Sequence, residues 1–194
     1  MPRLPRFDPA DALKETVALL EEANIDYALV GCLAVWAYVP PGGKRLTDDI
    51  DFAVSLKDLE PLLGLLEQHG YLFEPLPAGG FRTEVLGIVV DFIYGGSYLA
   101  DLFSSAVGSA KVIDYGDGIE VFVTNLDHLI TMKVAAGGEQ DEFDLRHLLK
   151  LIDTNRYKRL RSFVLNHTGY IGMMVLDRMA RSISHPGVGP PVRN

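Results

Sequence analysis

The 194-residue sequence contains a single cysteine, Cys32, and no long apolar run. One cysteine excludes an internal disulfide and a zinc site built from cysteines. The five histidines never fall at ligand spacing on one expected helix face. No apolar run approaches the ~20 residues that a membrane helix needs, and residues 1–16 lack the apolar centre of a signal peptide. We therefore expect a cytoplasmic protein that makes no contact with a membrane.

Positive charge is also scarce over most of the chain. Lys and Arg number 18 against 26 Asp and Glu, and residues 1–125 hold 8 basic against 19 acidic side chains. This balance disfavours broad non-specific binding of nucleic acid, which needs an extended basic surface. Residues 126–194 are mildly basic, with 10 basic against 7 acidic side chains. A basic run over 150–161 allows local contact with an RNA acceptor, or is simply a solvated face: Lys150, Arg156, Lys158, Arg159 and Arg161.

The hydrophobic periodicity predicts a mixed front half and an all-helical back half. Strand patterns cover residues 27–30, 49–54, 81–86, 88–94 and 119–123. Helical patterns cover residues 11–23, 33–39, 59–69, 97–107, 125–136, 139–152, 156–166 and 170–183. We predict an α+β fold with a small mixed twisted sheet flanked by helices over 1–124, followed by a helical subdomain over 125–184. The segment 185–194 is rich in Pro and Gly, and we expect it to be disordered.

Three aspartates form the most informative pattern. Asp49 and Asp51 lie two apart in an expected strand, so both side chains project from one face. Two carboxylates held this close repel each other unless a cation lies between them, and carboxylate oxygens suit Mg²⁺. Asp91 lies in the apolar strand 88–94, where a charged side chain needs a partner. If the two strands are neighbours, the three carboxylates converge on a two-metal site; Asp49 and Asp51 alone also suit an ordinary surface strand.

Gly31 lies where an apolar strand ends and a helix begins. Free backbone N–H groups at such a helix start bind anions, and glycine lets a phosphate approach closely. A phosphate-binding turn upstream of a metal-binding pair fits the two halves of a nucleotide–metal complex. Gly31 as an ordinary turn glycine is the alternative.

The stretches from Val30 to Val35 and from Arg45 to Asp51 resemble the signature of the nucleotidyltransferase superfamily, the polymerase-β-like group. They are similar to the small bacterial abortive-infection toxin-type and antibiotic nucleotidyltransferases. The signature runs apolar-Gly-(Gly/Ser)-x-Ala, then Arg-x-Thr-x-Asp-apolar-Asp, with a third Asp on a later strand. The matching residues are Gly31, Ala34, Arg45, Thr47, Asp49, Asp51 and Asp91. The resemblance implies the nucleotidyltransferase fold.

The resemblance also implies an activity. A nucleoside monophosphate would move from a nucleoside triphosphate to an unidentified acceptor (a small molecule, a protein or RNA), with release of pyrophosphate. Asp49, Asp51 and Asp91 would be catalytic and would hold two Mg²⁺ ions. Contacts to the triphosphate would come from Gly31, Cys32, Arg45 and Lys133.

Two features keep other functions open. Cys32 stands where the family usually has Gly or Ser, and Gln140 lies where a basic stretch is usual. Both changes suit a catalytically inactive nucleotide- or partner-binding protein of the antitoxin or scaffold type. A further alternative is a phosphohydrolase with Asp49 as nucleophile, although that chemistry is typical of a large parallel sheet.

Overall fold

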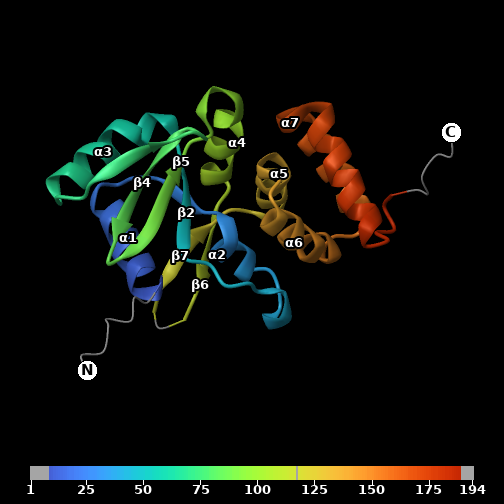
Figure 1. The fold of residues 1–194 in the computed structure, drawn as a ribbon, viewed down its shortest axis with the longest axis horizontal. Coiled ribbons are helices and arrows are strands. Elements are labelled where there is room, and N and C mark those ends of the chain that lie inside the picture. The colour runs from blue at the N-terminus through green and yellow to red at the C-terminus, as the bar shows by residue number, and fades with distance from the viewer. Residues whose placement is uncertain (1–8, 117, 189–194) are drawn as a thin grey trace.

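One mixed sheet forms the centre of the front half (Figure 1). The computed structural model describes residues 9–116 and 118–188. Over these residues seven strands pair in the order β3-β4-β5-β2-β1-β7-β6. The strands are β1 Tyr27–Leu29, β2 Asp49–Val54, β3 Phe73–Leu76, β4 Gly80–Val85, β5 Ile88–Ile93, β6 Lys111–Asp114 and β7 Glu120–Val123. The α+β fold predicted from the sequence is confirmed.

Helices cover both faces of this sheet. The helices are α1 Pro9–Glu22, α2 Gly31–Trp36, α3 Leu59–Gln68, α4 Gly96–Gly108, α5 Leu126–Ala136, α6 Glu139–Leu148 and α7 Thr154–Ser182. Leu20 of α1 and Leu62 of α3 share a buried cluster with Phe52 of β2. The next residue along β2, Ala53, belongs to a second cluster with Phe103 of α4. Because side chains alternate across a strand, α1 and α3 lie on one face and α4 on the other.

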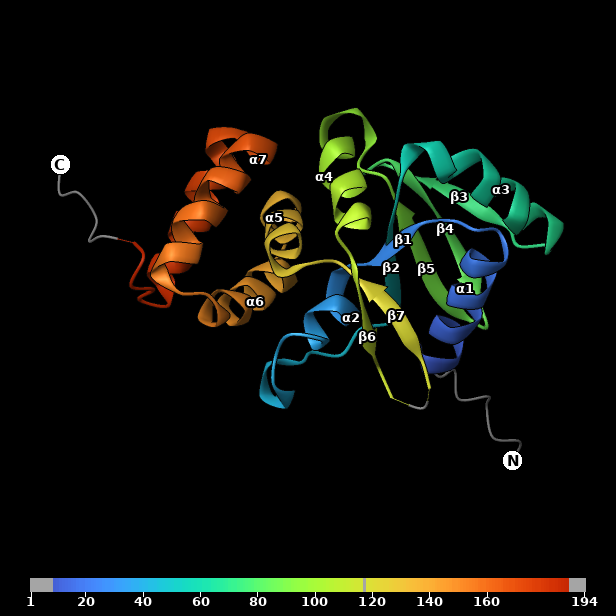
Figure 2. The same ribbon diagram turned by 180° about the vertical axis from the view of Figure 1, so that it is seen from behind.

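The helices α5, α6 and α7 form the back half, beside the sheet (Figures 1 and 2). Leu129 of α5 and Leu160 of α7 belong to the same buried cluster as Leu29 of β1, so the two halves share one core. Gly169 has φ +69 and interrupts α7. The sequence predicts two helices here, with 167–169 between them, and the interruption falls inside that gap.

Two strands are not predicted by the sequence, and both lie at the edges of the sheet. The strands β3 and β6 are mostly exposed, so neither shows the alternation of apolar and polar residues that marks a half-buried strand. Pro75 in β3 further weakens the pattern, although proline is tolerated at a sheet edge. The central strand predicted over 49–54 is found with those bounds.

The predicted disordered tail over 185–194 divides into two parts. Residues 189–194 lie outside the described residues. His185 is buried, and its Nε2 lies 2.9 Å from the carbonyl oxygen of Ile152. Within the described ranges, no helix is both long enough and apolar enough to span a membrane.

Candidate active site

The two strands that carry the aspartates lie side by side. Strand β2 pairs with β5 in parallel, and Asp51 and Asp91 are direct Cα partners. In β2, Asp49 and Asp51 are half-buried whereas the intervening Ile50 is buried. Since residues in register on neighbouring strands project from the same face, the three carboxylates share one face of the sheet.

Gly31 lies against the Asp51 carboxylate. A Cβ atom at position 31 would lie 1.8 Å from Asp51 Oδ2, far inside van der Waals contact, and the glycine has φ +62. The backbone N–H of Val30 donates to the Asp51 carbonyl oxygen at 2.8 Å, which fixes the two segments together. Both the positive φ and the Asp51 side chain therefore require glycine at position 31. The helix that follows, α2, has only six residues.

The carboxylate of Asp51 is short of positive charge. Burial, followed by the charges of Asp49 and Asp91, raises the pKa of Asp51 to about 7. Asp49 accepts a hydrogen bond from the Thr47 hydroxyl. No hydrogen bond or ion pair reaches the Asp51 side chain from any described residue. Asp49 and Asp51, at the start of β2, thus form a site of excess negative charge.

Asp91, by contrast, has a cationic partner. Arg82 of β4 donates from Nε to Asp91 Oδ1 and from Nη2 to Asp91 Oδ2, both at 2.7 Å. This is the bidentate arrangement in which a planar guanidinium matches a carboxylate. The Asp91 side chain is 9% exposed and that of Arg82 is 42% exposed. The hydrogen bond to Asp91 raises the pKa of Arg82 above its ordinary value, so its charge is permanent.

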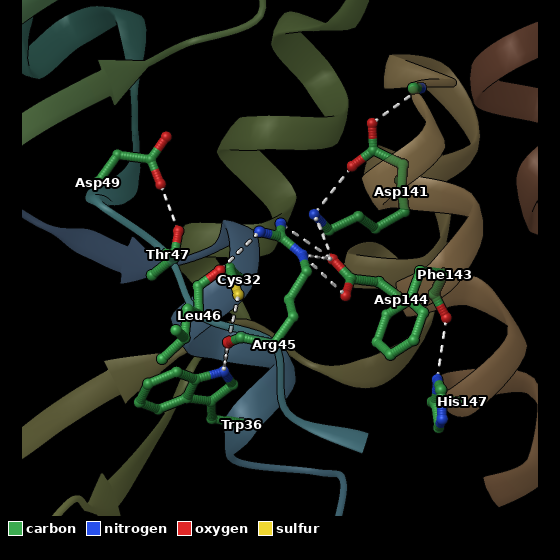
Figure 3. Close-up of polar contacts among 12 residues, drawn as sticks. Cys32, Trp36, Arg45, Leu46, Thr47, Asp49, Asp141, Phe143, Asp144 and His147 are labelled. Carbon is green, nitrogen blue, oxygen red and sulfur yellow. Dashed lines mark hydrogen bonds and ion pairs between the residues drawn. The ribbon is translucent and has the colours of Figure 1, made fainter. Parts of the chain in front are cut away.

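Arg45 points toward one buried carboxylate, Asp144 (Figure 3). Lys133 pairs with the same carboxylate. Arg45 Nε lies 3.3 Å from Asp144 Oδ1, and Lys133 Nζ lies 2.9 Å from Asp144 Oδ2. Lys133 Nζ also donates to Asp141 Oδ1 at 2.9 Å. Burial alone would lower the pKa of Lys133, but the two carboxylates raise it above its ordinary value. These four side chains form the Arg45–Asp144 network, which joins the loop before β2 to α5 and α6.

The backbone of Arg45 is held as firmly as its side chain. Trp36 Nε1 donates to the Arg45 carbonyl oxygen at 3.0 Å, and the Cys32 thiol approaches the same oxygen at 3.7 Å. Cys32 is buried, and burial raises the pKa of its thiol. An un-ionised buried thiol packs as a small apolar side chain rather than acting as a nucleophile.

A cavity of about 280 Å³ lies between the sheet and the back half. Gly31 and Asp51 line it from the sheet side, and Lys133 and Asp141 line it from α5 and α6. Its other walls are mostly apolar, and Phe103 of α4 is one of them. The cavity therefore places the partnerless carboxylate and a lysine at one solvent-accessible spot.

The donor set suits a hard cation at Asp49 and Asp51. Carboxylate oxygens are the ligands that Mg²⁺ takes, commonly one or two together with substrate phosphates. A cation there would also relieve the repulsion that raises the pKa of Asp51. Across the ranges that the structure describes, no group of three His, Cys, Asp or Glu side chains has the geometry of a metal site. The residues thus fit a two-carboxylate site, whereas both oxygens of Asp91 are bonded to Arg82.

The basic run over 150–161 is partly neutralised. Arg156 Nε donates to Asp127 Oδ1 at 2.9 Å, and Arg161 Nε donates to Asp177 Oδ1 at 3.0 Å. Two of the five basic side chains are therefore occupied within the protein. Lys150, Lys158 and Arg159 are exposed.

Sequence reasoning did not single out Arg82, although the sequence contains the signal. Two predicted strands flank Gly87, and a tight turn there pairs Val85 with Ile88. Counting back along this antiparallel hairpin places Arg82 opposite Asp91, as observed. An arginine facing an aspartate in such a register predicts an ion pair.

Comparisons with known proteins identify the fold. No protein-family model matches the sequence, and no curated protein matches it. Among solved structures, an antigenic nucleotidyltransferase-like protein from Paracoccidioides brasiliensis superposes with TM-score 0.53 and 15% identity, over 89% of each chain. The lincosamide antibiotic adenylyltransferase LnuA, solved with lincomycin bound, superposes with TM-score 0.52 and 16% identity, over 73% of this chain and 97% of that one. The fold that the resemblance implies is confirmed: the chain has the fold of the nucleotidyltransferase superfamily.

Proposed function

We propose that the protein is a Mg²⁺-dependent nucleotidyltransferase, which moves a nucleoside monophosphate from a nucleoside triphosphate to an acceptor. The observation that supports this most directly is the Asp51 carboxylate. It has no partner among the described residues, it lies against Gly31, and it shares a cavity with Lys133. A metal-bound triphosphate would supply positive charge to Asp51 and negative charge to Lys133.

Each side chain then has a role that follows from its position. Asp49 and Asp51 would hold Mg²⁺, which stabilises the charge that develops on the transferred phosphoryl group. The backbone N–H groups of Gly31 and Cys32 would bind phosphate oxygens. Lys133, which lines the cavity, would neutralise the leaving pyrophosphate. Arg45 would position the loop before β2, because its side chain is bonded to Asp144.

Asp91 is the third carboxylate on this face and is our candidate for the general base. The acceptor hydroxyl would pass its proton to Asp91 while its oxygen attacks the α-phosphorus. The bond from the α-phosphorus to the bridging oxygen would break, and pyrophosphate would leave. Each Asp91 oxygen uses one lone pair toward Arg82 and keeps a second for the acceptor.

The proposal is tested by label transfer. Purified protein is incubated with Mg²⁺, each of four α-labelled nucleoside triphosphates and a cell extract as the source of acceptor. We expect Asp49→Ala/Asp51→Ala to lower transfer at least ~100-fold, the scale of losing electrostatic stabilisation in a transition state. Glu84→Ala is the matched control and should leave transfer unchanged. Glu84 is an exposed carboxylate on β4, the strand that pairs with β5. Equal transfer by the wild type and the double variant would contradict the mechanism.

A second function, nucleotide binding without catalysis, is favoured by one observation. Both oxygens of Asp91 are bonded to Arg82, which would leave no base if that pairing prevented proton transfer. Such a protein would act as an antitoxin or scaffold. Thermal stabilisation by Mg²⁺ and a nucleoside triphosphate, without pyrophosphate release for any small-molecule, protein or RNA acceptor, would support this function instead.

A further inference from the structure

The bond between Arg82 and Asp91 sets the third carboxylate apart from the other two. Its two N···O distances are 2.7 Å, whereas Asp51 has no partner in the described part of the chain and Asp49 has only the Thr47 hydroxyl. The Asp91 side chain is almost fully enclosed. The three carboxylates are therefore unequal before any ligand arrives.

The sheet register fixes this inequality. Asp51, Asp91 and Arg82 are successive Cα partners across β2, β5 and β4, so their side chains form one row on one face. The turn at 86–87 is too short to let β4 slide against β5, so the backbone of Arg82 stays opposite Asp91.

A metal ion at Asp91 would have to compete with this guanidinium. It would have to displace a bidentate guanidinium from a nearly enclosed carboxylate, which forfeits two short charge-assisted hydrogen bonds. Mg²⁺ also gives up its water reluctantly, and it would arrive beside a permanent positive charge. At Asp49 and Asp51, by contrast, no cation of the described residues is bonded to either carboxylate.

We propose that the site binds one divalent cation, at Asp49 and Asp51, and that Arg82 supplies at Asp91 the positive charge of a second. Arg82 is then a positioning residue, which holds Asp91 ionised and oriented toward the acceptor. This inference differs from the two Mg²⁺ ions expected from the family resemblance. It rests on the proposed function for the identity of the first ion.

The test counts Mn²⁺ ions bound by the full chain, using electron paramagnetic resonance of free Mn²⁺ during titration. An ion is counted as bound at the site only if it is lost in Asp49→Asn/Asp51→Asn or in Asp91→Asn. Ions that remain in both variants are bound elsewhere on the protein and are not counted. We expect one site-bound ion in the wild type, lost in the double variant and unaffected by Asp91→Asn. In Arg82→Gln we expect a second ion, which is lost again when Asp91→Asn is added. Arg82→Lys keeps the charge and should retain a count of one.

The controls separate this inference from the proposed function. Circular dichroism at the titration temperature shows whether Arg82→Gln is folded, and Arg82→Lys gives an independent comparison if it is not. A wild-type count of two, with one ion lost in Asp91→Asn, overturns the inference but leaves the transfer reaction intact. A count of one in a protein that transfers no nucleotide overturns the proposed function alone. A count of zero overturns the inference, together with the metal site of the proposed function.

Discussion

Two charged clusters lie within the same part of this molecule and differ in their balance. The Arg45–Asp144 network pairs two cations, Arg45 and Lys133, with two carboxylates, Asp141 and Asp144. On the acidic face, Asp49, Asp51 and Asp91 have one cation bonded to them among the described residues, Arg82. The first cluster has as many cations as carboxylates, whereas the second has three carboxylates and one bonded cation.

This difference separates carboxylates that are paired within the fold from carboxylates that are not. Asp144 has 0% exposure and connects α6 to the loop before β2, so its ion pairs hold two parts of the chain together. Asp51 does the opposite, because burial and two neighbouring carboxylates make its ionisation unfavourable. A protein that keeps such a destabilising group usually keeps it for function.

The largest expected effect on stability comes from the Arg45–Asp144 network. Asp144→Ala leaves Arg45 and Lys133 without their shared carboxylate, which should cost about 3–5 kcal/mol and lower the thermal midpoint by roughly 10 °C. The control is Glu142→Ala on the same helix, whose surface pairs with Arg146 and Arg178 should be worth under ~1 kcal/mol. Scanning calorimetry of the two variants measures the difference. Equal losses would mean that the network is not structural.

A smaller effect is expected from Gly31→Ala. The new methyl group would meet the Asp51 carboxylate, and alanine is strained at φ +62, so we expect a loss of about 2–3 kcal/mol in urea unfolding. Gly42→Ala is the control, because a Cβ at Gly42 meets no atom within 4 Å; it should change stability by less than ~0.5 kcal/mol. Adding Asp51→Ala to Gly31→Ala should recover part of the loss. An undiminished loss in that double variant would show that strain at position 31, not contact, is the cause.

The acidic face of Asp49, Asp51 and Asp91 predicts that the stability of the protein depends on pH. The folded pKa of Asp51, about 7, lies above its unfolded value of about 3.9, so the folded state holds the proton more tightly. The stabilisation is full below pH ~4 and is lost as the pH rises through 7. In EDTA, the wild type should lose about 2–3 kcal/mol more between pH 5 and pH 8 than Asp51→Asn does, or roughly 5–10 °C in thermal midpoint. The exposed neighbour gives the control, Asp48→Asn, which should follow the wild type. Parallel curves for the wild type and Asp51→Asn would refute the assignment.

The smallest expected effect is stabilisation by Mg²⁺ alone. At ten times its dissociation constant, a ligand of the folded state adds about 1.4 kcal/mol, so a rise of a few degrees is expected. Asp49→Asn/Asp51→Asn should abolish this rise in thermal midpoint. Asp141→Asn, in the Arg45–Asp144 network, should retain it. If the rise survives in the first variant and disappears in the second, the roles of the two clusters are reversed.

The sequence predicted the central parts of the fold well, because they bury apolar residues at regular spacing. The bounds of β2 follow from the alternation of Asp49, Ile50, Asp51 and Phe52, and the interruption near Gly169 follows from the gap between two helical patterns. The edge strands β3 and β6 were missed because both of their faces are largely exposed. Periodicity reports burial, so it says little about elements that bury little.

The candidate site was predicted as a set of residues but not as an electrostatic arrangement. That Asp51 and Asp91 are neighbours depends on the pairing of β2 with β5, which spacing along the chain does not specify. That Arg45 and Lys133 share Asp144 depends on how α5 and α6 pack beside the sheet. Long-range packing sets both, and a single sequence carries little information about it.

The contact between Gly31 and Asp51 has a consequence for descendants of this chain. Because the carboxylate occupies the space of a side chain at position 31, changes at the two positions are coupled. Loss of the acid would remove the contact with Oδ2, but the positive φ and the nearby Asp51 Cβ would still oppose a side chain at position 31. Position 51 can therefore change while the glycine stays, whereas a side chain at position 31 demands a new residue at 51 and a different backbone turn.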